Sequence, residues 1–553
     1  MSHIRISIAC ALPLLSSLAL AGDPVLQPKA GAPLLGLSDS QLNAFNVGAI
    51  SYQTPLTIAT GLGPVFNKGG CMSCHSNPLG GWGAIAVTRF GMDDKGTFID
   101  PPEFGGSLLQ AEAISSACRE VIPPEATVTA TRMTNSSMAF GMIEAIPDAS
   151  INANADPLDG NGDGISGTVH WVLPLEAIAG SPLRAGRFGW KAQVATVLTF
   201  SGDASLNEMG LTNRLVPTEN APNGDHVLLS QCDTIADPED FADASGKHFI
   251  DRVTDFQRYL GPPPQTPKTG MAGEVIFNAV GCASCHIASW TTANTKGLES
   301  ALRNKTIRPY SDFLLHDMGM LGDGVRQGDA SEQEIRTPTL WNLRSRDPML
   351  HNGLAAGGPF ADRVTVAINA HGPFGESAAS ALAFDSLSAG DKASLIAFLD
   401  SLGRAEFDFD GDGVRDLEDF TILRSYAGAA SNPNLATAIG DIDVNGVINS
   451  IDATYFVQAI ENFEDAARDC NGNGIADLVD IFAGTMPDTN GDGRGDNCPT
   501  LCVEDFNRDG IVDAADLAVL LNGWGGAGGD LNADGNTDAA DLAVLLNAWG
   551  NCA

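Results

Sequence analysis

The short motif Cys-x-x-Cys-His occurs twice in this chain, at Cys71–His75 and at Cys282–His286. At this spacing, two thiols can bond to the vinyl groups of a haem while the adjacent histidine reaches the iron. A thioredoxin-like redox pair does not require the trailing histidine, and a zinc site requires further Cys or His residues nearby. The two copies therefore predict two covalently bound haem c groups. The predicted attachment residues are Cys71, Cys74, Cys282 and Cys285, and the predicted axial ligands are His75 and His286.

A second pattern places oxygen-bearing side chains at positions 1, 3, 5, 9 and 12 of a loop, with glycine at position 6. Alternate side chains of such a loop converge on a calcium ion, and the glycine permits the sharp turn. Five segments after residue 404 fit this pattern and predict bound calcium, each with Asp at position 12 and an apolar helix after it. The predicted ligands are Asp408, Asp410, Asp412, Asp416 and Asp419; Asp441, Asp443, Asn445, Asn449 and Asp452; Asp469, Asn471, Asn473, Asp477 and Asp480; Asp505, Asn507, Asp509, Asp513 and Asp516; and Asp530, Asn532, Asp534, Asp538 and Asp541.

The last two of these loops are near-copies of each other and resemble dockerin-type repeats. The segment from Asp488 to Cys498 is similar to the shorter calcium repeats of thrombospondin-like proteins and lacks a ligand at position 12. The resemblance implies a tail that docks to a cohesin-like partner or a surface scaffold. The alternative is a calcium-stabilised spacer that has no partner.

A partial loop of the same kind lies between the two Cys-x-x-Cys-His motifs. Asp159, Asn161 and Asp163 alternate correctly, but positions 9 and 12 are Gly167 and His170. A bound calcium ion and a simple Asx-turn loop both remain open for this segment.

The charge and length of the chain limit its possible functions and its number of domains. The chain has 31 Lys and Arg against 68 Asp and Glu in 553 residues, which argues against nucleic-acid binding because phosphate neutralisation needs clustered bases. Residues 405–553 alone carry 28 acidic and 5 basic side chains, so a domain boundary is expected near Arg404. The length predicts three to four domains.

The first 21 residues have the pattern of a signal peptide, with Arg5 before an apolar stretch and Ala19-Leu20-Ala21 as a cleavage site. A membrane anchor is disfavoured because the apolar run contains Pro13 and is too short to span a bilayer. We therefore expect a periplasmic, secreted or cell-surface protein without a membrane span. Disulfides form in such compartments, and the expected pairs are Cys118 with Cys232, Cys470 with Cys498, and Cys502 with Cys552, the last two being guesses.

A similar short segment precedes each haem motif, Leu62–Asn67 before the first and Ala272–Asn278 before the second. Both segments end in Phe-Asn, and a glycine follows shortly after each. An apolar periodicity of three and four residues predicts a terminal helix over 389–402. We therefore predict a mainly α chain with two cytochrome c-like haem domains followed by calcium-loop-plus-helix repeats of dockerin or EF-hand type. The predicted boundaries are 1–21 for the signal peptide, 22–260 and 261–404 for the haem domains, 405–482 for the first calcium repeats, and 483–553 for the thrombospondin-like repeat and the dockerin-like pair.

Several segments resemble the bacterial di-haem oxidoreductases that are grouped as peroxidases and also called thiol oxidoreductases. The resemblance covers about residues 35–402. The segments that carry it are Arg187–Ala192, Glu208–Asn213, Tyr310–Gly319 and Arg336–Trp341. More distantly, the layout is similar to di-haem cytochrome c peroxidases and to the methylamine-utilisation di-haem enzyme, which implies two fused cytochrome c domains.

The resemblance also implies roles for single residues. In the peroxidase relatives the distal ligand of the second haem follows an Arg-Thr-Pro motif, which favours His371 here. A solvated loop histidine is the alternative, and other side chains remain available: Tyr310, His316, Met318, Met320, Met349 and His351. After the first motif the next histidine is His170, so the first haem is expected to be open and to be the peroxide site.

Glu144 is the predicted distal base of that open site, by resemblance and because an acid in an apolar run should have a raised pKa. An exposed glutamate at a helix end is the alternative. Trp190 is the predicted electron relay and Arg187 a propionate partner, whereas a tryptophan in an apolar run can simply belong to the core.

These inferences favour an exported di-haem c-type cytochrome oxidoreductase of peroxidase type. Electrons from a small redox protein would pass through the second haem to peroxide at the first. The alternatives are a non-catalytic electron-transfer cytochrome and a surface-assembled, calcium-dependent binding protein.

Overall fold

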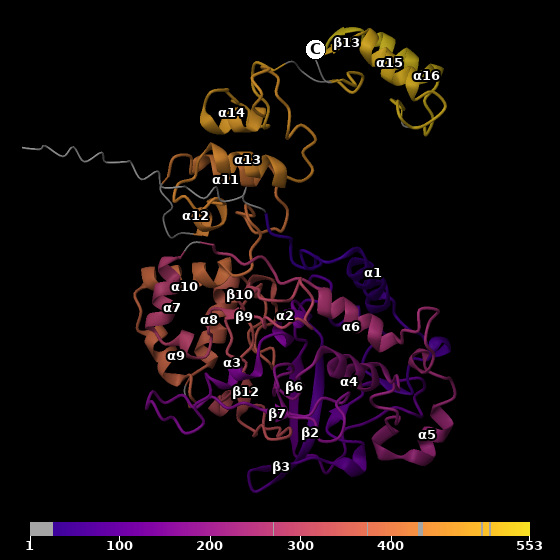
Figure 1. Cartoon of the computed structure of the whole chain (residues 1–553), viewed down its shortest axis with the longest axis vertical. Helices are drawn as coiled ribbons and strands as arrows, with labels where there is room; N and C mark the ends of the chain where they lie inside the picture. Colours follow the sequence, from indigo (N-terminus) through magenta and orange to yellow (C-terminus); the bar gives the residue numbers. More distant parts are fainter. Residues whose placement is uncertain are drawn as a thin grey trace, which may run out of the picture.

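The computed structural model describes residues 26–552 except 269, 373, 430–434, 499–501, 508–509 and 533. The predicted signal peptide (1–21) and one predicted calcium ligand, Asp509, lie outside the described residues. Over the part of the chain that is described, no helix is long and apolar enough to cross a membrane. Figure 1 shows a large body of mixed helices and small sheets, with the helices that follow residue 404 at one end of it.

Two crossed helices, α1 (Asp39–Gln53) and α6 (Phe249–Tyr259), organise the first half of the body. Phe45 and Tyr52 of α1 pack on Phe256 of α6, with ring centroids 5.2 and 4.6 Å apart. A Cβ at Gly48 would overlap the carbonyl oxygen of Arg252, so only glycine permits this approach. A third helix, α4 (Val197–Met209), packs on α6. The other helices of this half are α2 (Phe140–Glu144), α3 (Asp148–Asn152) and α5 (His226–Cys232).

The second half repeats this crossing with α7 (Ala272–Ala279) and α10 (Ala389–Ser401). Phe277 and Phe398 meet there with ring centroids 5.5 Å apart. A Cβ at Gly273 would overlap the carbonyl oxygen of Ser394. The predicted terminal helix over 389–402 is therefore present, and it packs on the helix that leads into the second haem motif. Helices α8 (Phe360–Ala370) and α9 (Ala378–Asp385) complete this half.

The expectation of a mainly α chain is only partly correct, because small sheets fill the region between the first motif and α6. The largest has β2 (Ala86–Asp94) paired with β3 (Thr97–Ile99), β4 (Leu108–Leu109) and β6 (Val128–Met133), all antiparallel. Val87, Thr88 and Phe90 have the branched or aromatic side chains that favour strands. Smaller pairs are β1 (Val65–Phe66) with β5 (Glu112–Ala113), β7 (Trp171–Val172) with β8 (Arg184–Ala185), β9 (Trp290–Thr291) with β10 (Thr306–Ile307), and β11 (Leu315–Asp317) with β12 (Glu334–Arg336).

The tail after residue 404 contains short helices, five of which follow a predicted calcium loop, whereas the helix Leu435–Gly440 precedes the second loop. Phe407, Phe420 and Phe456 form part of its buried core. The helices are α11 (Leu417–Ser425), α12 (Leu435–Gly440), α13 (Ser450–Ala459), α14 (Asp477–Ala483), α15 (Ala514–Asn522) and α16 (Ala539–Asn547), and β13 (Ile511–Val512) pairs with β14 (Gly550–Asn551). The structure contains the disulfides Cys118–Cys232, Cys470–Cys498 and Cys502–Cys552, the three pairs named from the sequence.

Candidate active site

The first Cys-x-x-Cys-His motif borders a cavity of about 1170 Å³. Residues Cys71–Ser73 form a single 3-10 turn, and the N–H of His75 donates to the carbonyl of Cys71 (2.9 Å), so both thiols and the imidazole line one cavity. Nδ1–H of His75 donates to the carbonyl of Gly81 (3.3 Å), which leaves Nε2 available for a metal. Burial lowers the pKa of His75 to about 4, so the ring is neutral at neutral pH.

The second motif is built in the same way against a second cavity of about 1260 Å³. Cys282–Ser284 form the 3-10 turn, and the N–H of His286 donates to the carbonyl of Cys282 (3.0 Å). Nδ1–H of His286 donates to the carbonyl of Tyr310 (2.8 Å). Burial lowers the pKa of His286 to about 4. Both histidines are thus held in the tautomer and charge state that bind iron through Nε2.

The four motif cysteines are unpaired, and burial keeps them protonated. It raises the pKa of Cys71 to about 12 and those of Cys74 and Cys282 to about 11, and it also raises the pKa of Cys285. A thioredoxin-like pair would instead have a lowered thiol pKa. Two unpaired thiols and a neutral imidazole on the wall of a large cavity fit a haem in each site. Covalent attachment through these thiols remains a prediction from the motif.

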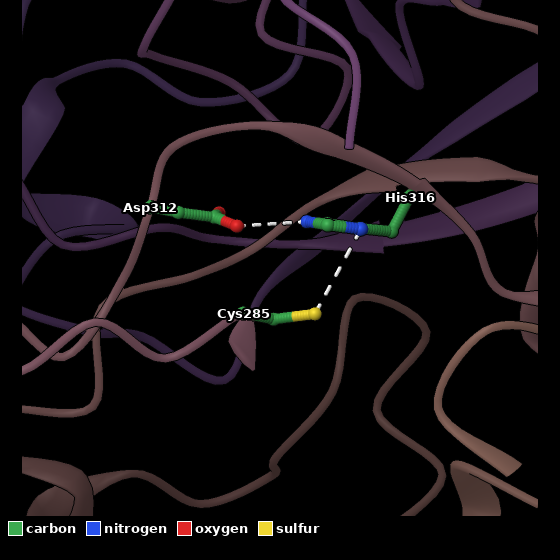
Figure 2. Close-up of side chains that lie close together, drawn as sticks. All are labelled: Cys285, Asp312 and His316. Atoms are coloured by element: carbon green, nitrogen blue, oxygen red, sulfur yellow. Dashed lines mark hydrogen bonds and ion pairs between the residues drawn. The ribbon is translucent and has the colours of Figure 1, made fainter. Parts of the chain in front are cut away.

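A charged cluster lies beside Cys285, as Figure 2 shows. His316 pairs through Nε2 with Asp312 (2.8 Å) and through Nδ1 with Glu376 (2.7 Å), and Nδ1 lies 3.7 Å from Sγ of Cys285. Burial by itself lowers the pKa of His316, but the hydrogen bonds to Asp312, Cys285 and Glu376 raise it to about 12. Cys285, Asp312 and His316 each offer one ligand atom, and these atoms lie within 4.8 Å of one another, so this cluster leaves a metal ion open as the alternative to haem for the second motif.

His371 lies directly after α8 and lines the same cavity as His286. Its Nδ1–H donates to the carbonyl of Ala367 (2.7 Å), so Nε2 is the ring nitrogen that can reach an iron. Burial lowers the pKa of His371, and electrostatic repulsion from His371 contributes to the lowered pKa of His286. The arrangement agrees with His371 as the second axial ligand. Of the open alternatives, Met320 is 78% exposed and is not part of this cavity wall.

The first cavity differs from the second in the side chains that face it. Among the described residues of its wall, His75 is the only histidine. Asp203 and Glu208 of α4 face the cavity, and burial raises the pKa of both carboxyls. Arg89 lies close enough to interact electrostatically with both carboxyls. The wall of the second cavity has three imidazoles besides His286, those of His316, His351 and His371, and it also contains Met318 and Met349. The first site therefore offers carboxyl groups where the second offers further imidazoles.

A family model described as "di-haem oxidoreductase, putative peroxidase" matches residues 112–402, slightly more than half of the chain. The chain belongs to this di-haem oxidoreductase family. The match includes α4 and the second motif but begins after the first motif, so the assignment of the first cavity depends on the geometry described above. No curated protein matches this di-haem oxidoreductase.

Two solved structures have a slight likeness to this di-haem oxidoreductase. Hydrazine synthase of Kuenenia stuttgartiensis is 12% identical, with 72% of this chain and 100% of that chain covered and a TM-score of 0.29. A MauG-like protein associated with microbial copper homeostasis is 13% identical, with 68% and 94% covered and a TM-score of 0.30. At such TM-scores the likeness is too slight to assign a function.

Glu144, the predicted distal base of the oxidoreductase, does not lie in the wall of the first cavity. It ends α2, where one carboxylate oxygen accepts from the N–H of Val197 (2.6 Å) and the other pairs with Arg258 (2.8 Å). It therefore links α2 to the start of α4 and to α6, a position that gives no support to a catalytic role at the first cavity, and that role stays a prediction. Sequence reasoning missed Asp203 and Glu208, although Glu208 opens one of the segments that carry the family resemblance.

Trp190 contributes to the walls of both cavities of the oxidoreductase. Its Nε1–H donates to the carbonyl of Met133 (2.8 Å). This position between the two sites favours the relay over a purely structural core residue. Arg187, by contrast, lies in neither of these two cavity walls, and it donates to the carbonyls of Ile143 and Ile146 and pairs with Asp148. The structure therefore gives no support to Arg187 as a propionate partner.

The tail's calcium loops are preformed to different degrees. Carboxylate oxygens converge within 4.8 Å of one another at Asp408, Asp410 and Asp419, and likewise at Asp441, Asp443 and Asp452. The Asp at position 12 also accepts the N–H of position 9, as at Asp541 and Asp538 (2.8 Å), which caps the following helix. The donor set of the first two loops fits calcium, which binds through oxygen.

In the partial loop between the haem motifs, aspartate side chains accept hydrogen bonds from backbone N–H groups of the same loop. Asp156 accepts the N–H of Gly160 (2.8 Å) and Asp159 that of Gly164 (3.2 Å). Asn161 also accepts the N–H of Asp163 (2.9 Å), and Asp163 accepts that of Ile165 (2.9 Å), which is the Asx-turn pattern, so this alternative stays open beside a bound ion.

Proposed function

We propose that this chain is an exported c-type di-haem oxidoreductase that reduces peroxide at its first haem site. A reduced donor, expected to be a small redox protein, would deliver electrons at the second site. The observation that carries the proposal is the difference between the two cavities. Both walls contain a Cys-x-x-Cys-His set, but the second also contains His371, whereas the first contains Asp203 and Glu208 and, among its described residues, no second histidine.

When bound, haem iron supplies the one-electron chemistry that side chains lack. His75 and His286 would each hold an iron through Nε2, and His371 would close the second site against peroxide. Reduction of peroxide to two waters consumes two electrons and two protons. Asp203 and Glu208 are proposed to hold and deliver those protons, because burial favours their protonated forms. Trp190 is proposed to carry electrons between the sites.

We also propose that the tail binds calcium at the five loops and that the protein is exported after removal of residues 1–21. The convergence of carboxylates in the first two loops supports calcium. Docking of the tail to a cohesin-like or surface partner is a second, separate proposal. It would be tested by asking whether the full chain stays bound to the cell surface while a chain without residues 405–553 does not.

The decisive experiment uses holoprotein made in a host that attaches c-type haem. Absorbance and electron paramagnetic resonance spectra are recorded before and after peroxide is added to the half-reduced form. A high-spin signal that disappears with peroxide is the expected result. The proposal would be contradicted by two low-spin haems whose spectra do not change with peroxide in any redox state. A non-catalytic electron-transfer cytochrome would then be the better interpretation.

A further inference from the structure

Three side chains from distant parts of the sequence form a stack in the wall between the two cavities. Cζ of Arg346 lies 4.0 Å from the ring centroid of Trp82 and 5.0 Å from that of Trp190. The guanidinium thus interacts with the π systems of both indoles. Trp82 belongs to the loop that follows the first haem motif, and Arg346 follows the 3-10 turn Leu343–Ser345.

Trp190 connects the stack to both haem sites, because it lines both cavities, and Arg346 lines the second. Gly81, the neighbour of Trp82, provides the carbonyl that accepts Nδ1–H of His75. An electron that crosses between the sites through Trp190 therefore passes beside Arg346.

Arg346 is a buried cation without a carboxylate partner within ion-pair distance in the described part of the chain. It is 3% exposed, and one Nη2–H donates to the carbonyl of Leu350 (3.2 Å). Burial, with a smaller contribution from Arg336, lowers the pKa of Arg346 to about 9, so it stays charged at neutral pH. The two indole faces therefore contribute to stabilising this charge.

A fixed cation has opposite effects on the two redox states of an indole. It is attracted to the negative face of the neutral ring, but it repels the radical cation that remains when the ring loses an electron. Trp190 cannot escape this repulsion by releasing its proton, because Nε1–H donates to the carbonyl of Met133, which is not a base. An oxidised Trp190 is therefore unfavourable beside Arg346.

We propose that Arg346 holds Trp82 and Trp190 in one stack and prevents either from remaining oxidised while electrons pass between the sites. The inference depends on the proposed peroxidase function. In each transfer, Trp190 loses one electron toward the first site and regains one from the second, so the indoles end unchanged. Two such transfers, with electrons from the reduced donor, supply the two that peroxide consumes.

The test compares Arg346→Gln and Arg346→Met, which remove the charge, with Arg346→Lys, which keeps it. Each holoprotein is half-reduced, mixed with peroxide and freeze-quenched for electron paramagnetic resonance. Wild type and R346K should show little tryptophan radical, and the neutral variants should accumulate roughly tenfold more of it. Adding Trp190→Phe to R346Q should abolish the radical. Mass spectrometry then locates oxidised indoles, expected at Trp82 or Trp190.

The outcomes separate the two proposals. If peroxide leaves the wild-type spectra unchanged, the proposed function fails. If peroxide reacts normally but the neutral variants form no more radical than wild type, or the radical persists without Trp190, only the role of Arg346 is overturned. The role of Arg346 would also be overturned if both neutral variants lost their bound haem while R346K kept it. The charge would then be needed to form the haem-bearing structure and not to control the indoles.

Discussion

The two candidate proximal histidines are prepared for iron by the backbone around them. A carbonyl holds Nδ1–H of each ring, from Gly81 for His75 and from Tyr310 for His286, and burial keeps each ring neutral. His371 lines the second cavity, whereas Asp203 and Glu208 of α4 line the first. Under the proposed function, this difference separates electron entry from peroxide chemistry.

Asp203→Asn and Glu208→Gln should each slow the reaction of the first site with peroxide by roughly 100-fold, because a group that carries protons in the transition state is lost. Stopped-flow absorbance after peroxide addition measures this rate. Haem content should stay unchanged. The matched control is Glu144→Gln, which should leave the rate near wild type while costing about 1 to 2 kcal/mol of stability, since it weakens the contacts with Val197 and Arg258. The assignment would be contradicted if E144Q reacted slowly with peroxide while D203N and E208Q reacted at the wild-type rate.

Glu239 gives a pH dependence of stability that is independent of haem. Burial raises the pKa of this carboxyl from 4.5 to about 7, although the Ile250 N–H donates to it. Between these values the folded chain binds more protons than the unfolded chain, so stability is full below pH 4.5 and falls as the pH rises toward 7. Glu239→Gln should flatten this slope in thermal unfolding of the holoprotein. An equal slope in wild type and E239Q would disprove the link.

At the scale of elements, the two halves use the same device to place a haem motif. In each half, a helix that precedes the 3-10 turn of cysteines crosses a second helix at a glycine: Gly48 of α1 meets α6, and Gly273 of α7 meets α10. The Phe-Asn echo does not mark equivalent positions, because Phe66 lies in strand β1 and Phe277 in helix α7. The sequence did not predict the sheet of β2 and β6, because its strands come from segments that are far apart in the chain.

Gly273→Val should disrupt the crossing of α7 and α10 and cost about 3 kcal/mol or more, because the new side chain overlaps backbone that cannot move away. Only the second site depends on this crossing, so haem absorbance per chain should fall by about half. Gly390→Val in the partner helix α10 is the control, since its Cβ meets nothing nearer than 3.8 Å. Full haem content in G273V would show that the crossing is dispensable.

At the scale of the whole molecule, the acidic tail is attached to the haem-bearing body through its first calcium loop. Lys29 donates to the carbonyl of Gly413 (2.7 Å), and Arg344 to that of Asp410 (3.1 Å). Glu406 is fully buried at the joint and pairs with Lys268 (3.0 Å). The cations of the body thus contact backbone oxygens of the loop, which leaves its carboxylates for an ion.

Removing calcium should loosen the tail, because the clustered carboxylates then repel one another. In limited proteolysis of the holoprotein with a chelator, we expect new cleavage within residues 405–553, with residues 26–404 and their haem spectrum preserved. Added calcium should restore protection, and magnesium at the same concentration should restore less, because it favours a smaller octahedral site. Cleavage that is identical with and without calcium would argue that the loops are held by helix capping alone.

The sequence alone determined the features that are local. A Cys-x-x-Cys-His motif and a calcium loop bring their groups together within a dozen residues, so the spacing by itself predicts which atoms meet. The same holds for the terminal helix over 389–402, whose apolar periodicity is visible in one segment. These parts of the site required no knowledge of the packing.

Only the tertiary structure decided the groups that meet across long distances in the chain. The apolar neighbours of Glu144 in the sequence favoured it as the distal base. In the folded chain, however, Glu144 contacts Val197 and Arg258, and the acids that line the cavity are Asp203 and Glu208. The contact of Trp82 with Arg346 joins residues from different halves of the chain. Neither residue's local pattern marks it, because the energy of a buried side chain depends on neighbours that the fold, and not the spacing, brings to it.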